Sequence, residues 1–205
     1  MSNISFLSVD LQYDFSREGG AAYVSGKSVT FVREILLPHF ERTGLKTSEI
    51  ISDYRQPRPG DPRDMCHPGG WGYLSEIPSD LRKGKQWVKC MNSPLWTRKE
   101  VGKAGKDPSI PYQDPARFDR WLSGNIGGPS ESEFVALFGL ALDACVLCTA
   151  QELTFRGYDV RIIREATDTR TGSVAEKDRM LSNPPITYWA DPIGWKEIIN
   201  ALDGD

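Results

Sequence analysis

Short runs of apolar residues alternate along the chain with longer segments in which apolar and polar positions are mixed. The runs that we expect to form buried strands are 4–9, 49–52, 86–89, 133–139 and 158–163, with a short sixth run at 186–190. Continuous apolar runs indicate strands that are covered on both faces, and helical segments between such strands are typical of a parallel sheet. The pattern predicts an α/β fold with three layers (α/β/α), a Rossmann-like arrangement around a mainly parallel six-stranded sheet.

Three segments between these runs have helical features. Residues 27–43 carry apolar side chains at helical spacing, although Pro38 is expected to kink or interrupt that helix because proline has no amide donor. A second helix is expected to end at Arg156-Gly157, where glycine suits the left-handed position after a helix. Residues 192–202 are expected to form a closing helix.

Two segments depart from the alternation. Residues 55–80 are rich in proline and glycine and are too long for an ordinary connection, which indicates a functional loop. Residues 97–117 are polar and include a cluster of lysines, which a solvated surface explains more simply than a binding patch. We expect residues 1–205 to form a single domain that carries this loop and this insert.

Composition and charge exclude several classes of function. The net charge of −3 leaves no basic surplus to neutralise phosphates, so no nucleic-acid partner is expected. No apolar run approaches the ~20 residues that cross a bilayer, and the N-terminal residues lack the pattern of a signal peptide, so no membrane partner is expected either. Four cysteines without a secretion signal are expected to be reduced thiols in a cytoplasmic protein.

Three chemically useful side chains lie at or beyond strand ends, where open parallel sheets bind their ligands. Asp10 follows the first strand, Lys89 ends the third, and Cys145 follows the fourth. An ammonium favours the thiolate of a cysteine whose unperturbed pKa is ~8.5, and a carboxylate can accept the thiol proton. Each residue alone also has an ordinary interpretation: Asp10 as a turn or cap residue, Lys89 as a solvent-exposed side chain, and Cys145 as a small buried hydrophobe.

The spacing of Cys145 and Cys148 admits other sites. A thioredoxin-like C-x-x-C pair also lies at a helix start after a strand, but the intervening Val-Leu and the position after four strands fit that fold poorly. A zinc site would need two further ligands, and the other candidates are scattered at Cys66, His67 and Cys90. We therefore interpret Cys148 as structural and Cys145 as the exposed thiol at the start of the helix.

Three motifs occur in order over nearly the whole chain. They are DLQYDF at 10–15, a strand ending at Lys89 before a serine-containing turn at 90–95, and GLALDACVLCTA at 139–150 followed by GYDV at 157–160. Together they resemble the isochorismatase-like cysteine hydrolase superfamily, which includes nicotinamidases and N-carbamoylsarcosine amidohydrolase.

This resemblance implies roles for individual residues. Cys145 would be the nucleophile that attacks an amide or related acyl carbon, Asp10 would take the thiol proton and pass it to the leaving amine, and Lys89 would hold both groups. The peptide bond Leu140–Ala141 would be cis, and the N–H groups of Ala141 and Cys145 would form the oxyanion hole. One oxyanion donor can lower a barrier by ~2.7–4 kcal/mol.

The chain departs from the metal-binding nicotinamidases of this family. Those proteins follow the second strand with Asp-x-His and add two further histidines, whereas this chain has Asp53-Tyr54-Arg55 and, in the region of the last ligand, only His67. Two potential ligands make a poor site for a divalent ion, so we predict no catalytic metal and no cofactor. Nicotinamidase activity is therefore not expected. Members that hydrolyse a vinyl ether lack the cysteine, so Cys145 favours amide chemistry.

Substrate contacts are predicted from the loops. Flat apolar side chains expected to wall the pocket are Phe15, Trp71, Tyr73, Leu95 and Trp96. Arg55 or Arg170 is a candidate to pair with a substrate carboxylate. Thr149 is a further candidate for substrate contact, with a bond back to its own helix as the alternative. For each aromatic residue, the core or an oligomer interface is an equally good explanation.

The function expected from these features is that of a metal-independent cysteine amidohydrolase. It would cleave a C–N bond of a small amide or N-carbamoyl compound through a thioester, and family habit suggests a homo-oligomer, either a dimer or a tetramer. The alternatives are a catalytically silent binding or regulatory member of the fold, an isochorismatase-type hydrolase of another small molecule, and a thiol–disulfide oxidoreductase that uses Cys145 and Cys148.

Overall fold

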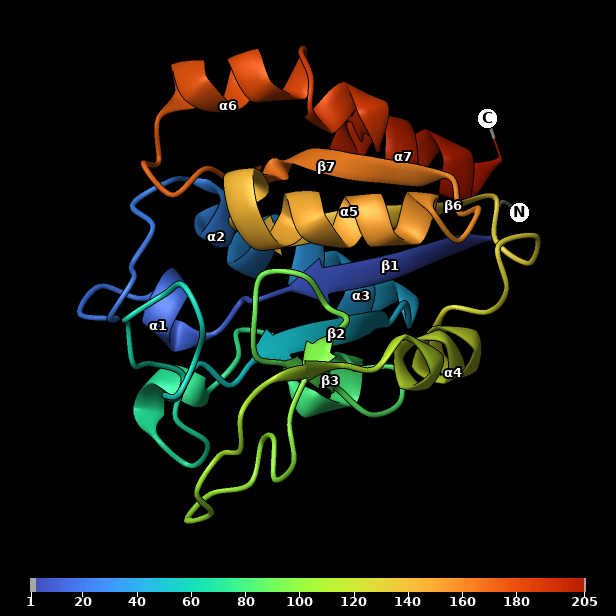
Figure 1. The fold of residues 1–205 in the computed structure, drawn as a ribbon. Coiled ribbons are helices and arrows are strands. Elements are labelled where there is room, and N and C mark those ends of the chain that lie inside the picture. Colours follow the sequence, from blue (N-terminus) through green and yellow to red (C-terminus); the bar gives the residue numbers. More distant parts are fainter. Residues whose placement is uncertain (1–2, 205) are drawn as a thin grey trace.

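A computed structural model describes residues 3–204 and contains one six-stranded parallel sheet (Figure 1). Its strands lie in the order β3-β2-β1-β6-β7-β8, and every neighbouring pair is parallel. Their bounds are β1 Ile4–Val9, β2 Thr47–Ser52, β3 Trp87–Lys89, β6 Phe134–Leu140, β7 Val160–Asp168 and β8 Asp191–Ile193. The fold class and five of the six predicted strand positions are confirmed.

Helices cover both faces of this sheet, which gives the three layers. On one face, α7 (Trp195–Asp203) packs against α2 (Ser28–Phe31) and α3 (Leu37–Thr43) through the aromatic ring of Trp195. On the other face, α4 (Pro115–Asn125) and α5 (Leu147–Thr154) lie in front of the strands in Figure 1. Two short helices complete the fold, α1 (Tyr13–Ser16) and α6 (Val174–Leu181).

Pro38 changes the first helical segment without ending it. A π-helical turn over Val32–Leu36 joins α2 to α3, and Pro38 lies in the first turn of α3. Proline removes one hydrogen bond from the interior of a helix, and the wider π-helical turn lies directly before it. The expected interruption is therefore a wider turn inside one continuous helical segment.

The predicted sixth strand at 186–190 is wrong. Ile186–Tyr188 form a 3₁₀ turn, and the edge strand is the following segment, β8, which pairs with Arg161–Ile163 of β7. The amides of Trp189 and Ala190 both donate to the Ile186 carbonyl, at 2.8 and 3.0 Å, so they are not available to a neighbouring strand. The apolar side chains of this segment are compatible with either structure, and the local hydrogen bonds decide between them.

The two unusual segments fold beside the carboxyl ends of the strands. Residues 55–80 form an extended loop with short 3₁₀ turns at Trp71–Tyr73 and Ser79–Leu81. Residues 97–117 begin in β4 (Trp96–Thr97), return through the antiparallel β5 (Tyr112–Gln113) and end in the first turn of α4. Among residues 3–204, the helices are all too short or too polar to cross a membrane.

Candidate active site

The carboxyl ends of β1, β2 and β3 bring three polar side chains together. Asp10 directly follows β1, and Ser52 of β2 is paired in register with Lys89 of β3. Asp10 has a left-handed backbone (φ 50°), a conformation that aspartate tolerates better than most residues, and its amide donates to the Ile50 carbonyl. All three side chains are fully buried.

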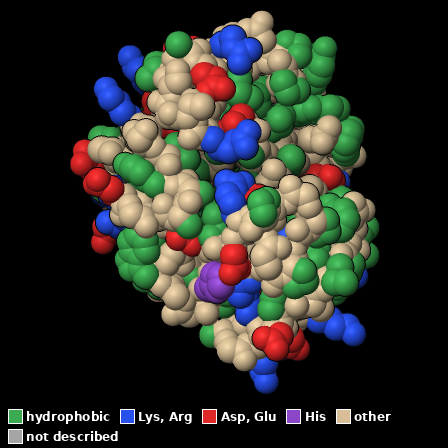
Figure 2. All heavy atoms as spheres, turned by 60° about the vertical axis from the view of Figure 1, so that its left-hand side comes forward, with side chains coloured by type: hydrophobic (Ala, Val, Ile, Leu, Met, Phe, Trp, Pro, Cys, Tyr) green, Lys and Arg blue, Asp and Glu red, His purple; other side chains and the backbone are tan. Residues whose placement is uncertain are grey.

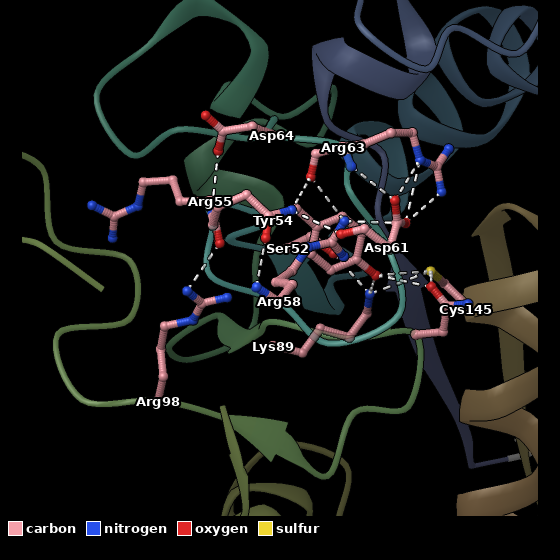
Figure 3. A network of polar contacts seen from close by, with 12 residues as sticks. Ser52, Tyr54, Arg55, Arg58, Asp61, Arg63, Asp64, Lys89, Arg98 and Cys145 are labelled. Carbon is pink, nitrogen blue, oxygen red and sulfur yellow. Dashed lines mark hydrogen bonds and ion pairs between the residues drawn. The ribbon is translucent and has the colours of Figure 1, made fainter. Parts of the chain in front are cut away.

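The Lys89 ammonium is the centre of this cluster (Figure 3). Its Nζ lies 2.7 Å from Asp10 Oδ2, 2.7 Å from Ser52 Oγ and 2.6 Å from the Tyr54 hydroxyl. It also lies 3.3 Å from the sulfur of Cys145. The other Asp10 oxygen accepts from Ser52 Oγ at 2.8 Å. The Asp10 carboxylate and the Cys145 sulfur, which the sequence predicted to lie together with Lys89, therefore both contact its Nζ atom.

Cys145 reaches this cluster through a sharp turn after β6. Gly139 has φ +121°, and a Cβ there would lie 2.0 Å from the Val9 carbonyl oxygen, so only glycine lets β6 pass this close to β1. The Leu140–Ala141 peptide bond is cis, at the position that the family resemblance predicts. A π-helical turn over Leu142–Val146 then carries Cys145 and leads into α5. Such turns are frequent at functional sites.

Burial and neighbouring charges shift the pKa values of this cluster in opposite directions. Burial raises the pKa of the Cys145 thiol to about 12, although the Lys89 ammonium lowers it. Burial also works against the Lys89 ammonium, but the negative groups around it, Asp10 first, raise its pKa well above the ordinary value. The pKa of Tyr54 is likewise raised well above its usual range, mainly by burial. At neutral pH the cluster therefore holds an ammonium, a phenol and a thiol.

Cys145 lines a cavity of about 190 Å³. The residue is nevertheless buried and Cys148 is the more exposed of the two, so the prediction of an exposed Cys145 thiol is wrong. Apolar walls come mainly from Phe15, Val24, Met65 and Leu140, and polar groups come from Asn92, Arg63 and Arg170. A second, more open hollow of about 560 Å³ adjoins it and shares Asn92 and the two arginines. Figure 2 views the molecule toward this edge and shows cationic side chains along the middle of the face.

The two shared arginines are each anchored by one aspartate. Arg63 holds Asp61 at 2.7 Å, and Arg170 holds Asp143 at 2.7 Å through its Nε. Their side chains remain about half exposed, at 48% and 59%. A guanidinium has five N–H donors, so each arginine keeps donors for another group after binding its aspartate.

The first motif has structural roles besides Asp10. The Gln12 side chain brackets the end of β2, donating to the Ser52 carbonyl at 2.9 Å and accepting from the Ser52 amide at 2.6 Å. Asp14 accepts from the Cys66 amide at 2.6 Å and so fixes the loop that passes over the site. This motif thus places Asp10, aligns Ser52 and holds the 55–80 loop in position.

The structure distributes the predicted substrate contacts unevenly. Phe15, Ala141 and Cys145 line the small cavity, and Trp96 lines the outer hollow. Trp71 is half exposed and packs on the ring of Tyr13, at 5.4 Å between centroids. The predicted contacts that lie outside both linings are Trp71, Tyr73, Leu95 and Thr149.

Asp53, the first candidate metal ligand, is already engaged by the protein. Arg55 binds both of its oxygens, at 2.8 and 2.7 Å, and the Gly102 amide donates at 2.9 Å. Burial would raise the pKa of Asp53, but these hydrogen bonds lower it below the ordinary value. His67 instead pairs with Asp64 on the surface, at 3.1 Å.

This arrangement does not fit a divalent ion. Across residues 3–204, no three side chains of His, Cys, Asp or Glu lie together as a metal-binding group. Because Asp53 already holds a cation, a metal would have to displace a buried guanidinium. Arg55 itself turns toward the 97–117 insert, where it donates to the carbonyls of Lys106 and Glu100, and away from the thiol cavity.

Several residues of the site were not predicted from the sequence. They include the polar residues Ser52, Tyr54, Arg63 and Asn92. Ser52 and Tyr54 had a usable signal, because they lie at the end of a predicted parallel strand beside the one that ends at Lys89. Arg63 and Asn92 lie in irregular segments, where periodicity gives no information about direction.

Comparisons with known proteins complete this description. No protein-family model matches the sequence, and no curated protein matches it. Among solved structures, an isochorismatase-like hydrolase from Alkaliphilus metalliredigens is similar with a TM-score of 0.66 and 16% identity, over 98% of this chain and 99% of that one. A pyrazinamidase from Pyrococcus horikoshii, in complex with zinc, has a TM-score of 0.58 and 16% identity, over 94% and 99%.

A third structure is an N-carbamoylsarcosine amidase from Thermoplasma acidophilum. It has a TM-score of 0.55 and 21% identity, over 94% of this chain and 95% of that one. All three likenesses extend over almost the full length of both chains, so they describe the whole fold and not one motif. The chain therefore has the fold of the isochorismatase-like hydrolases.

Proposed function

We propose that the protein is a cysteine-dependent amidohydrolase that cleaves a C–N bond of a small amide or N-carbamoyl compound. One observation carries this proposal: the Cys145 sulfur and the Asp10 carboxylate both contact Lys89 Nζ, and the same sulfur lines a small cavity. A base, a cation and a nucleophile at one point are the parts that acyl transfer requires. Amidases among the similar structures agree with this reaction class.

The first half of the reaction would form a thioester. Asp10 takes the proton of the Cys145 thiol, and the thiolate attacks the substrate carbonyl carbon. Ala141 and Cys145 line the cavity beside the sulfur, as an oxyanion hole made of their N–H groups requires. When the tetrahedral intermediate collapses, the C–N bond breaks, and Asp10 returns its proton to the departing nitrogen.

The second half would release the acid. Water takes the place of the departed amine, Asp10 accepts a proton from it, and the hydroxide attacks the thioester carbon. The C–S bond then breaks, and the proton returns to sulfur, which restores the thiol. Lys89 stays an ammonium throughout, and its charge balances whichever of Asp10 and Cys145 is negative.

The rim of the cavity supports a substrate that carries a carboxylate. Arg63 and Arg170 come from separate parts of the chain and line both the thiol cavity and the outer hollow. A substrate whose amide reaches Cys145 would place its other end between these guanidiniums, which bind carboxylates through paired hydrogen bonds. Arg170 was predicted as a candidate to bind a substrate carboxylate. The other predicted candidate, Arg55, lines neither the thiol cavity nor the outer hollow.

A metal has no part in this proposal. The zinc of the similar pyrazinamidase belongs to that protein, and here the carboxylate of Asp53 is bound by Arg55 and Gly102. The reaction steps accordingly use only groups of the chain and the substrate. The cytoplasmic location and the homo-oligomeric assembly remain predictions.

Ammonia release from matched pairs of compounds tests the proposal. Succinamate and N-carbamoylglycine each carry a carboxylate, whereas butyramide and ethylurea are their neutral counterparts. We expect the protein to release ammonia from at least one anionic compound. The rate with the neutral counterpart of that compound should be lower by about ten-fold or more. The Cys145→Ala variant should release no ammonia. In Arg170→Gln the preference for the anion should shrink through a higher KM.

Three results would contradict different parts of the proposal. Full turnover by Cys145→Ala would remove the nucleophile assignment. Equal rates for the anionic and neutral members of each pair would leave the amidohydrolase and remove the carboxylate-binding role of the rim. No release from a broad panel of small amides and ureas would favour the silent, ligand-binding member of the fold.

A further inference from the structure

The hydroxyl of Tyr54 lies against the sulfur of Cys145 with no space between them. The distance from the hydroxyl oxygen to Sγ is 3.2 Å, and the side chain is 2% exposed. The ring is held by Arg58, whose guanidinium lies 4.0 Å from its centroid, and by Phe15, which packs in a T-shaped arrangement with 6.1 Å between the ring centroids. A phenol held this firmly beside a nucleophile is placed to act on it.

The Lys89 ammonium has too few protons to bond all of its polar neighbours. Lys89 has three N–H donors and four polar neighbours, and three of them lie at 2.6–2.7 Å: Asp10, Ser52 and Tyr54. The sulfur, at 3.3 Å, is the fourth and most distant. Once the three short bonds form, Lys89 has no proton left for Cys145.

Tyr54 supplies the missing donor. Its oxygen accepts from Lys89, so its own proton is free to point at either of two acceptors, Cys145 Sγ at 3.2 Å or Asn92 Oδ1 at 3.4 Å. In the resting thiol form, the S–H group has Asn92 Oδ1 within 3.6 Å as an acceptor. When the thiol loses its proton, the sulfur becomes an acceptor only, and the phenol can turn to it.

We propose that Tyr54 is a further catalytic residue, which donates a hydrogen bond to the Cys145 thiolate and transmits the positive charge of Lys89 to it. This inference rests on the proposed function for its catalytic meaning, while the hydrogen bond itself can be tested without any substrate. Hydrogen bonds to charged groups are about twice as strong as neutral ones, so the loss should be measurable.

Tyr54→Phe is the direct test, because the ring stays and only the hydroxyl is lost. Iodoacetamide labelling of Cys145, followed peptide by peptide between pH 8 and 9.5, should slow about 3- to 10-fold, since less thiolate is present at each pH. The Lys89 proton that Tyr54 accepted is freed in this variant and offsets the loss only in part, because Nζ lies farther from the sulfur, at 3.3 Å. The matched control is Tyr158→Phe, whose buried hydroxyl donates to the distant Gly127 carbonyl at 2.7 Å. Its labelling rate should equal that of the wild type.

The sign of the effect separates this role from a structural one. A variant that merely loosened the site would expose Cys145 and label faster. Labelling at the wild-type rate or faster would therefore overturn the proposal, and so would a kcat/KM within two-fold of the wild type on any amide that the protein hydrolyses. The expected result is a 10- to 100-fold lower kcat/KM, with the thiol limb of its pH profile moved to higher pH.

The same measurements keep the two proposals apart. Slower labelling in Tyr54→Phe, together with no amide hydrolysis by the wild type, would retain the hydrogen bond and reject the amidohydrolase. Hydrolysis that depends on Cys145 but not on Tyr54 would retain the amidohydrolase and reject the hydrogen bond as a catalytic element.

Discussion

Two buried acid–base pairs lie at the carboxyl ends of neighbouring strands, and they differ in how their donors and acceptors are matched. In the Asp53–Arg55 pair, both carboxylate oxygens are bound by the guanidinium, and the remaining arginine donors meet carbonyls of the 97–117 insert. In the Asp10–Lys89 pair, the ammonium has more polar neighbours than protons, and one neighbour is the thiol at the cavity.

This difference separates a structural pair from a chemical one. The Asp53–Arg55 pair is closed, because its main donors and acceptors are used within the protein, and it fastens the insert to the end of β2. The Asp10–Lys89 pair is open, because the ammonium has one polar neighbour more than it has protons, and the Tyr54 hydroxyl beside it can turn between Cys145 Sγ and Asn92 Oδ1. Substitutions in the two pairs should therefore have different consequences.

The largest effect is expected from Lys89→Met. The variant loses the charge that balances Asp10 and the thiolate, so kcat/KM should fall by about 10³-fold or more. Stability should fall as well, by about 3–5 kcal/mol, because the Asp10 carboxylate is left buried without its cation. Steady-state rates normalised to the folded fraction measure the first effect and urea unfolding the second. Turnover close to that of the wild type would contradict the open-pair account.

Asp53→Asn should act on stability alone. It leaves Arg55 buried opposite a neutral amide, and we expect a loss of about 3–5 kcal/mol in the free energy of unfolding. The kcat/KM per folded molecule should stay within a few-fold of the wild type. If activity instead falls far more than the folded fraction, Asp53 has a chemical role, such as holding a metal, and the comparison fails.

The pH dependence of stability should show the buried thiol. The pKa of Cys145 is about 12 in the folded chain against an ordinary 9.0, so between these values the unfolded chain has lost a proton that the folded chain keeps. Stability must then fall as the pH rises from about 9 to 12, by roughly 1–3 kcal/mol. Cys145→Ala should show a flatter curve in parallel urea titrations. Parallel curves for the two proteins would show that folding does not raise the pKa of the Cys145 thiol.

The smallest effect is expected from Ser52→Ala. Ser52→Ala and Tyr54→Phe each free one Lys89 proton, but Ser52→Ala keeps the Tyr54 hydroxyl at 3.2 Å from the sulfur. The variant loses only part of the support of Asp10, so kcat/KM should change less than in Tyr54→Phe, by about five-fold or less. A loss as large as that of Lys89→Met would show that proton counting does not describe the cluster.

The sequence predicted the parts of the site that belong to regular structure. Asp10, Lys89 and Cys145 were found because strand ends in a parallel sheet share one edge. In the structure, Asp10 and Cys145 both contact Lys89 Nζ. The strand at 186–190 failed because its apolar residues satisfy a 3₁₀ turn as well as a strand. Apolar patterning does not distinguish those two when local hydrogen bonds make the choice.

The rest of the site depended on loop geometry. Trp71 and Leu95 are apolar, as pocket walls often are, but their direction is set by segments without periodic structure. Arg63 enters the cavity because Asp14 holds the 55–80 loop at Cys66, a contact that links residues 52 positions apart. Arg55 was a reasonable candidate for the substrate, yet its nearest carboxylate is Asp53, two residues before it.

The most direct test of the central claim is the mass of the enzyme during turnover. Wild-type protein is mixed with the amide that releases ammonia most rapidly, quenched in acid after milliseconds to seconds, digested and mapped by mass spectrometry. A covalent bond between Cys145 and the substrate's acyl carbon predicts that its peptide gains the acyl mass, and that hydroxylamine removes it. An unmodified Cys145 peptide during full turnover, or an acyl group found only on Cys66, Cys90 or Cys148, would contradict the account.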